Sequence, residues 1–243
     1  MRYAVISDVH SNLEALTAFL TKADRAGYDR IVCLGDIVGY NANPNECIEL
    51  LREREALCVM GNHDSRAAGL EDESAFNFHA ALAIQWTRGA LKEENREFLG
   101  NLPRALQVNR KFLAVHGWVN DTDLYILGPR DAAENFKLMK DARTRVCFFG
   151  HTHVPAVFTE VEGGAELVDG EQVRLLKGAS YLINPGSIGQ PRDRDPRLSF
   201  VIYDTKKSQV KYYRVEYDIS ATAGKILAAG LPDRLAERLK LGW

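Results

Sequence analysis

Short runs of apolar residues recur through residues 1–153, and each run stops at a glycine or at polar side chains. Runs of this length with such a stop are typical of buried strands that end in tight loops. The pattern predicts strands over residues 3–7, 31–34, 56–60, 112–115 and 146–149.

Between these runs the apolar residues change to helical spacing. Leu13, Leu16, Phe19 and Leu20 share one face of a segment that ends near Gly27, which predicts an amphipathic helix. Similar patterns predict helices from Pro44, over residues 74–86 and 91–99, and from Pro129 or Asp131 through Met139.

The period changes again after residue 153. Residues 154–217 contain only strand-like runs separated by turn residues, which predicts an antiparallel meander. Residues 219–239 are helical in pattern, with a break at residues 230–232. We therefore expect one domain over residues 1–243, with a βα half (1–153), antiparallel strands (154–217) and C-terminal helices (218–243).

Composition narrows the class of protein. The 243 residues are 46% hydrophobic and 26% charged, with a net charge of −2, so a nucleic-acid or membrane-surface partner is not expected. A strand-like run directly follows Met1-Arg2, and no apolar stretch reaches membrane-spanning length. The four cysteines stand singly, as reduced thiols do in a cytoplasmic protein.

Polar residues gather directly after the five strands of the βα half. Ligands of open α/β sheets bind outside the carboxyl ends of the strands, so loops from neighbouring strands would bring these side chains together. Only His79, of the six histidines, lies elsewhere. The residues at the strand ends are Asp8, His10, Asp36, Asn62, His63, His116, His151 and His153.

This set combines carboxylate, amide and imidazole donors without a thiolate. Such mixed ligation suits divalent Mn or Fe, as well as Zn, Ni or Co. The candidate ligands are too many for one tetrahedral site. They suit two metal ions about 3.5–4 Å apart that share a bridging carboxylate, as in two-metal phosphoesterases.

The ordered motifs Asp-x-His, Gly-Asp, Gly-Asn-His-Asp, His-Gly and Gly-His-x-His resemble those of the calcineurin-like metallophosphoesterase superfamily. The phrases at residues 35–46 and 184–193 look like its small prokaryotic branch, which contains phosphodiesterases and dinucleoside-tetraphosphatase-like proteins. The resemblance implies a four-layer α/β/β/α sandwich, with a mixed sheet from the βα half and an antiparallel sheet from the C-terminal half.

The resemblance also implies a role for each residue. Asp36 would bridge two metal ions, most simply Mn²⁺, and a metal-bound hydroxide would attack phosphorus. His63 would face the phosphoryl group and assist the leaving group, and Asp64 would hold the ring of His63 in the working tautomer. The first metal would be held by Asp8, His10, Asp36 and His153, and the second by Asp36, Asn62, His116 and His151.

Other interpretations of these residues stay open at this point. Asp8 and Asp36 could be helix caps or turn residues, and Asn62 could cap the next helix. A lone His-x-His pair, such as His151 and His153, is often only a surface pair.

Several residues outside the motifs are candidates for substrate contact. Arg192 lies in a loop after a turn and can bind phosphate oxygens. Tyr40 and Asn41 follow the bridging aspartate closely, and the indole of Trp118 stands where relatives carry a small hydroxyl residue. We read His79, between aromatic residues on its helix, as structural or exposed.

The expected function is hydrolysis of a phosphodiester or nucleotide-type phosphoanhydride in a small phosphorylated substrate. The continuation after Asp36 lacks the Asp-Arg-Gly sequence of protein Ser/Thr phosphatases, which argues against that class. Two alternatives remain: a phosphomonoesterase acting on a small metabolite, and a non-catalytic scaffold that binds a protein partner. A nuclease is disfavoured because the chain has no basic excess.

Overall fold

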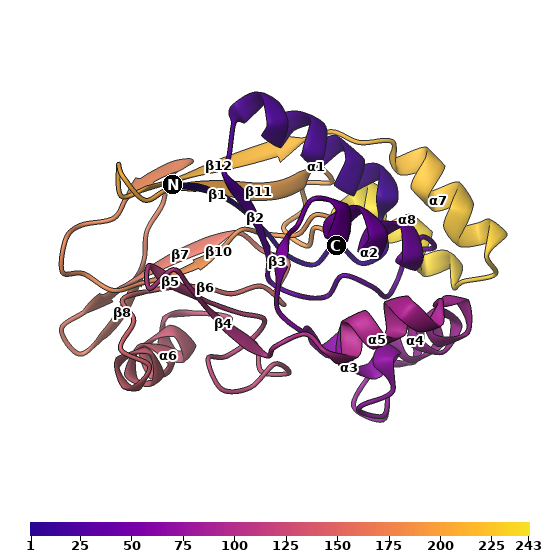
Figure 1. The fold of residues 1–243 in the computed structure, drawn as a ribbon, viewed down its shortest axis with the longest axis horizontal. Coiled ribbons are helices and arrows are strands. Elements are labelled where there is room, and N and C mark those ends of the chain that lie inside the picture. The colour runs from indigo at the N-terminus through magenta and orange to yellow at the C-terminus, as the bar shows by residue number, and fades with distance from the viewer.

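The computed structural model describes all 243 residues, and its centre is a pair of stacked six-stranded sheets (Figure 1). The strand order of the first sheet is β3 (Leu57–Cys58), β2 (Arg30–Cys33), β1 (Arg2–Ile6), β11 (Leu198–Asp204), β12 (Gln209–Val215) and β9 (Gln172–Arg174). In this sheet, β1 runs parallel to β2 and antiparallel to β11, and β2 runs parallel to β3.

The second sheet is also mixed. Its strand order is β4 (Ala105–Val108), β5 (Phe112–Val115), β6 (Val146–Phe148), β10 (Tyr181–Asn184), β7 (Ala156–Val161) and β8 (Gly164–Leu167). Strand β10 runs parallel to β6 and antiparallel to β7, while β5 runs parallel to β6 and antiparallel to β4.

The two halves of the chain interleave in both sheets, which differs from the expectation of one sheet for each half. Tyr3 of β1 pairs with Tyr203 of β11, and Cys147 of β6 pairs with Leu182 of β10. Periodicity identifies strands but does not say which strands pair, and here the central pairings join residues far apart in sequence. The pattern does not predict the short hairpin strand β4, whose residues are exposed or half-buried except for the last one.

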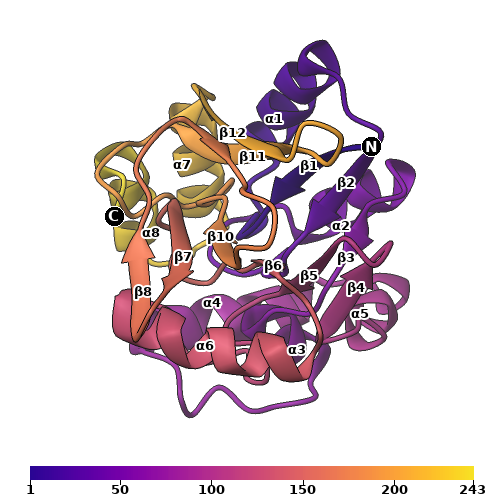
Figure 2. The same cartoon turned by 90° about the vertical axis from the view of Figure 1, so that its left-hand side faces the viewer.

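The four-layer α/β/β/α sandwich is confirmed. The helices α1 (Leu13–Ala26) and α2 (Pro44–Glu53) cover the first sheet, and α6 (Pro129–Asp141) covers the second. Figure 2 shows α1, the two sheets and α6 from top to bottom. Tyr3 and Phe112, which meet edge to face with ring centroids 5.1 Å apart, belong to the core between the sheets. Because both faces of each sheet are covered, the central strands have nearly continuous apolar sequences.

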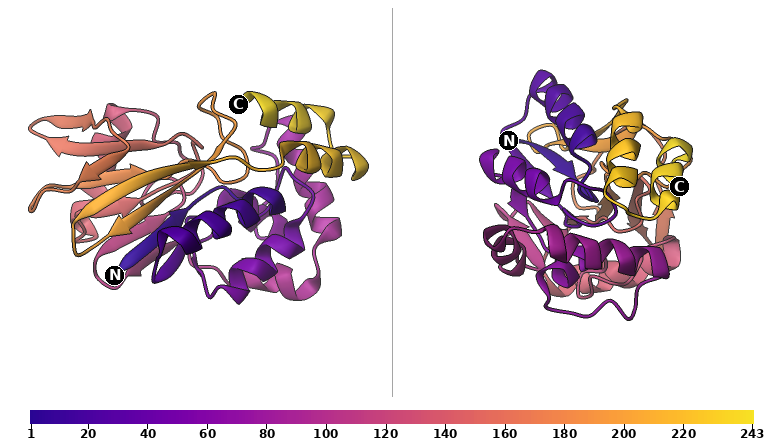
Figure 3. Two further views of the ribbon diagram at one scale, coloured as in Figure 1. Left: turned by 90° about the horizontal axis from the view of Figure 1, so that it is seen from above. Right: turned by 90° about the vertical axis from the view of Figure 1, so that its right-hand side faces the viewer.

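The remaining helices gather at one end of the sandwich, where the C-terminal helices lie beside helices from the middle of the chain (Figures 1 and 3). An apolar cluster that includes Tyr40, Ala83, Ile226 and Leu235 joins these segments. No helix of the structure combines the length and apolarity that crossing a membrane requires. The helices at this end are α3 (Asn62–Ala68), α4 (Phe78–Ala90), α5 (Glu93–Gly100), α7 (Ile219–Ala228) and α8 (Asp233–Leu241).

Two helix boundaries show what the pattern could and could not predict. The break at residues 230–232 is confirmed and separates α7 from α8. Helix α4 begins at Phe78, later than the predicted start at Ser74, because the Asn77 side chain caps it by accepting from Ala80 N at 3.1 Å. The hydroxyl of Ser74 instead donates to Asp72 in the preceding turn.

Candidate metal centre

The loops that leave the carboxyl ends of β1, β2, β3, β5 and β6 converge between the two sheets. Every side chain predicted as a metal ligand lies in this convergence, and each is at most 4% exposed. The predicted ligands are Asp8, His10, Asp36, Asn62, His116, His151 and His153.

The backbone of these loops is unusual for residues with side chains. The left-handed conformation costs on the order of 1–3 kcal/mol per non-glycine residue and collects at functional sites. Hydrogen bonds between the loops hold it, such as that from His10 N to Asp36 O at 2.9 Å. The ligand candidates with positive φ are Asp8 (55°), His10 (47°), Asp36 (52°), His151 (67°) and His153 (60°).

The first donor group consists of Asp8, His10, Asp36 and His153. The Nε2 atoms of His10 and His153 are 3.2 Å apart. His10 Nε2 lies 3.5 Å from Asp36 Oδ2, and His153 Nε2 lies 3.4 Å from Asp8 Oδ1. Ligands around a metal ion at 2.0–2.2 Å are separated by roughly 3–3.5 Å, so these atoms are spaced to share one ion.

The second donor group consists of Asp36, Asn62, His116 and His151. His116 Nε2 lies 3.3 Å from Asp36 Oδ2, 3.1 Å from Asn62 Oδ1 and 3.1 Å from His151 Nδ1. Asp36 Oδ2 is therefore close to ring nitrogens of both donor groups. This arrangement places one carboxylate oxygen between two potential ions.

Each histidine of the two groups has its other ring nitrogen against a backbone carbonyl. A carbonyl only accepts, so that nitrogen carries the proton and the nitrogen facing the centre offers a lone pair. These contacts fix the tautomers that metal ligation needs. The proton-bearing atoms and acceptors are His10 Nδ1 with Val38 O (3.0 Å), His116 Nδ1 with Leu34 O (2.8 Å), His153 Nδ1 with Gln190 O (2.6 Å) and His151 Nε2 with Asp123 O (3.1 Å).

The charges in the centre are strongly coupled. Burial lowers the pKa of His10 and of His151 to about 3, so both rings are neutral ligands. Burial acts in the same direction on His116, but the Asp36 and Asp8 carboxylates and the hydrogen bond to Leu34 O together outweigh it and raise the pKa of His116 to about 9. A metal ion bound by the second group would displace that proton. The donor sets therefore fit two divalent cations.

Other residues occupy the N-cap positions of the neighbouring helices, although Asp36 Oδ1 also accepts from His63 N at 2.9 Å at the start of α3. The caps of α1 and α2 are Asn12 and Asn43, not Asp8 or Asp36. Gly61 is the N-cap of α3, so Asn62 is the first residue of that helix. A Cβ atom at Gly61 would overlap Asp36 Oδ1 and the backbone beside it, which explains why glycine precedes Asn62.

Asp64 does not have the expected contact with His63. Its carboxylate accepts from Ile37 N at 2.9 Å, Val38 N at 3.2 Å and Gly61 N at 3.0 Å. Asp64 therefore ties the loop after β2 to the start of α3. The pattern could not distinguish this role, because a carboxylate beside a histidine in sequence points elsewhere once both lie in one helical turn.

His63 lies beside the centre in an aromatic enclosure. Its ring centroid is 4.8 Å from that of His10, 4.5 Å from that of Tyr40 and 4.5 Å from that of Phe76. Its Nδ1 atom is buried without a hydrogen-bond partner and faces Gly39, where a Cβ atom would collide with it. The ring is thus held in place by packing, with Nε2 as its remaining polar atom.

The candidate substrate contacts fall in different places. Tyr40 packs on His10 with centroids 4.5 Å apart, and Arg192 Nη2 donates to the Tyr40 hydroxyl at 3.4 Å. Asn41 instead supports the loop of His10, because its Nδ2 donates to His10 O at 2.7 Å. The half-buried Trp118 donates to Tyr125 O at 2.9 Å and so holds a loop beside the centre.

Sequence reasoning missed the residues that support His151. Tyr125 stacks on its ring with centroids 3.8 Å apart, and Asp123 supplies the carbonyl described above. The buried Arg66 donates to both carboxylate oxygens of Asp123, at 3.0 and 3.3 Å, and to Asn62 O at 3.1 Å. Only the position of Arg66, one turn after Asn62, was a usable signal in the sequence.

Comparison with known proteins identifies the family of this chain. The model of the calcineurin-like phosphoesterase superfamily domain matches residues 1–208. An uncharacterized protein of Methanocaldococcus jannaschii is 43% identical over 242 residues, which cover 98% of this chain and 97% of that protein.

Solved structures agree with this match. A metallophosphoesterase from Sphaerobacter thermophilus is 39% identical and superposes with a TM-score of 0.87, with 100% of both chains covered. A hypothetical protein from Pyrococcus horikoshii shares the fold, with a TM-score of 0.81, 23% identity, and coverage of 100% of this chain and 98% of that one. The chain therefore belongs to the calcineurin-like phosphoesterase superfamily and is a phosphoric ester hydrolase.

Proposed function

We propose that the protein hydrolyses a phosphodiester or a nucleotide-type phosphoanhydride at a binuclear centre of divalent metal ions. The main support for this proposal is the position of the Asp36 carboxylate. Asp36 Oδ2 lies 3.5 Å from His10 Nε2 of the first donor group and 3.3 Å from His116 Nε2 of the second. A single carboxylate between two complete donor groups is what a bridged metal pair requires.

The chain supplies the ligands, and the metal ions would supply the Lewis acidity. When bound, two divalent ions stabilise charge on phosphoryl oxygens and lower the pKa of bound water. The mixed oxygen and imidazole ligands suit Mn²⁺ and also accept Fe, Zn, Ni or Co. Asp8 and Asp36 are the only carboxylates in the two donor groups, so two dications leave excess positive charge that attracts a phosphate.

His63 would assist the departing oxygen. It lies between the metal ligands and the aromatic rings of Tyr40 and Phe76. With Nδ1 packed against Gly39, the proton available to the leaving group is the one on Nε2. Arg192, which packs over the Tyr40 ring with its guanidinium carbon 5.8 Å from the centroid, would pair with phosphate oxygens.

The test uses protein stripped of metal and then supplied with Mn²⁺. Initial rates are compared on bis(p-nitrophenyl) phosphate and p-nitrophenyl phosphate, with metal content measured on the same samples. We expect diester hydrolysis that requires about two ions per chain. Faster hydrolysis of the monoester would contradict the proposed bond and identify a phosphomonoesterase. Full activity with one ion per chain would contradict the binuclear centre.

A further inference from the structure

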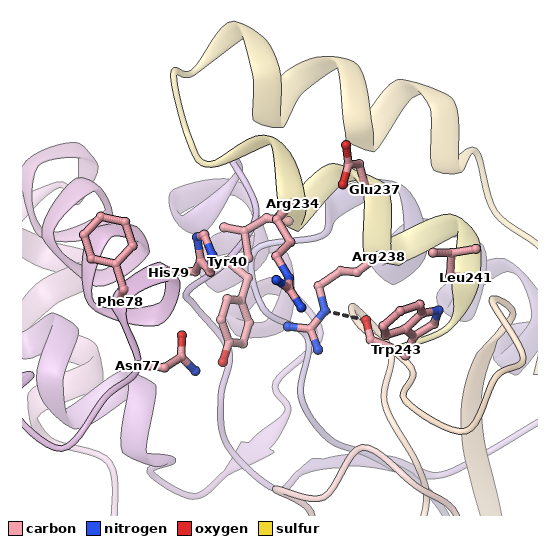
Figure 4. Close-up of a pocket in the computed structure, with 10 residues that line it drawn as sticks. Tyr40, Asn77, Phe78, His79, Arg234, Glu237, Arg238, Leu241 and Trp243 are labelled. Carbon is pink, nitrogen blue, oxygen red and sulfur yellow. Dashed lines mark hydrogen bonds between the residues drawn. The ribbon is translucent and has the colours of Figure 1, made fainter.

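A cavity of about 600 Å³ opens beside the metal centre, between helices α4 and α8. Segments that are far apart in the sequence line this cavity together, and Figure 4 shows their side chains. Polar and aromatic groups face each other across it. The lining includes Tyr40, Asn77, His79, Arg234, Arg238 and Trp243.

Tyr40 is the wall that this cavity shares with the metal centre. Its ring packs on His10 and His63, with centroid separations of 4.5 Å in both cases. The same ring lines the cavity. A substrate whose reacting phosphate lies at the donor groups could therefore extend past Tyr40 into the cavity.

Arg192 and Arg238 lie over the Tyr40 ring with Arg234 close to Arg238, and none of the three pairs with the side chain of an aspartate or glutamate. The guanidinium carbons of Arg192 and Arg238 lie 5.8 and 6.0 Å from the centroid of the Tyr40 ring. Arg234 is one helical turn before Arg238, on the same face of α8. Neither Arg192, Arg234 nor Arg238 forms an ion pair with an aspartate or glutamate.

The three charges act on one another. Burial lowers the pKa of Arg238 to about 10, and the charges of Arg192 and Arg234 act in the same direction. Arg192 Nε is buried without a hydrogen-bond partner. Glu237, the acidic residue of the lining, points away from both arginines of α8 in Figure 4. Gathering like charges in a half-buried place costs free energy unless an anion binds there.

Other polar groups of the cavity can assist an anion. His79 lines the cavity and its Nδ1 atom is buried without a partner. Arg238 is held in place because its Nε donates to the backbone oxygen of Trp243. Its terminal nitrogens remain available to a ligand.

We propose that Arg192, Arg234 and Arg238 form a second phosphate subsite, so that the substrate carries at least two linked phosphate groups. The inference rests on the proposed function for the reacting phosphate, which lies at the metal centre. It narrows the substrate class to phosphoanhydrides, such as nucleoside polyphosphates, in preference to simple diesters. Arginine suits this task because its planar fork binds phosphate oxygens in pairs.

The test measures binding of two nucleotides to the Mn²⁺-loaded protein by calorimetry. Adenosine 5′-(α,β-methylene)diphosphate has two linked phosphorus groups and resists cleavage between them, whereas AMP has one phosphate. We expect the wild-type protein to bind the first at least about tenfold more tightly, and Arg234→Gln/Arg238→Gln to reduce this ratio to about twofold or less. Arg234→Gln alone, at an exposed position, should reduce the ratio partially.

Lys240→Gln is the matched control, because it removes a positive charge from α8 outside the cavity lining. It should leave the ratio unchanged. A ratio unaffected by the arginine substitutions, or reduced equally by Lys240→Gln, would overturn the subsite. Failure of the proposed function would give a different result. The wild-type protein would then show no Mn²⁺-dependent hydrolysis of bis(p-nitrophenyl) phosphate, whatever the ratio of the two nucleotide affinities.

Discussion

The two donor groups of the proposed metal centre contain similar residues but are supported differently. In the first group, His10 and His153 are anchored by Val38 O and Gln190 O, in segments buried beneath the helices. In the second group, His116 is likewise anchored by the buried Leu34 O, but His151 is anchored by the carbonyl of Asp123. The carboxylate of Asp123 is 44% exposed and belongs to a surface loop.

This difference makes the first donor group the more rigid one, because part of the second depends on a surface loop. Buried backbone anchors move only when the core opens, whereas a surface loop can open locally at lower free energy. The stack of Tyr125 on His151 and the contacts of Arg66 restrain that loop. We therefore expect the second donor group to bind its metal ion more weakly and to exchange it faster.

The largest expected effect comes from the residue that the two groups share. Asp36→Asn removes a charge that both ions need, so the two affinities should fall together and kcat should drop roughly a thousandfold or more. Metal content by mass spectrometry and steady-state kinetics measure these effects. Loss of only one ion would show that Asp36 belongs to one group alone.

His63→Ala should lower turnover without lowering metal binding by either donor group. The residue is not a proposed ligand, so about two ions per chain should remain while kcat falls roughly a hundredfold or more. Metal content measured on the same samples is the control that both donor groups stay intact. Turnover equal to that of the wild type would remove His63 from the mechanism.

Arg66→Met should weaken the second group selectively. Loss of the contacts to Asp123 and Asn62 O releases the support of two ligands, and such supporting partners are worth about 10–100-fold in metal affinity. Titration of metal-free protein with Mn²⁺ should show one weakened and one unchanged site. Arg54→Met, which breaks an exposed pair with Asp24, should change neither. Equal weakening of both sites would show that the two donor groups do not differ in how they are supported.

Arg192→Gln is expected to have the smallest effect, because it leaves both donor groups intact. It removes a charged donor beside Tyr40, so KM for an anionic substrate should rise about tenfold or less. Arg194→Gln, at an exposed position in the same loop, is the matched control. Kinetics identical to the wild type would show that the Arg192 side chain does not contact the substrate.

The motifs predicted more of this molecule than the periodicity did. The strand ends that carry Asp8, Asp36 and His116 were recognisable because apolar runs stop abruptly at polar residues. The pairing of β1 with β11 was not recognisable, because no local pattern records which distant strands pair. The four-layer architecture followed from the resemblance rather than from the pattern itself.

The candidate site shows the same division between local and distant information. The donor residues were found because each lies in a short motif, whereas Asp123 supports His151 through a backbone carbonyl that any residue type could supply. The spacing of Arg234 and Arg238 put both on one helical face. Only the packing of α8 against Tyr40 showed which way that face points.

The central claim is that Asp36 bridges two metal ions, and electron paramagnetic resonance of the Mn²⁺-loaded protein tests it most directly. Two ions about 3.5–4 Å apart and joined by a carboxylate should give an exchange-coupled spectrum. A carboxylate-bridged pair should give this spectrum in the wild-type protein and lose it in Asp36→Asn. Two uncoupled Mn²⁺ signals, or saturation at one ion per chain, would contradict it.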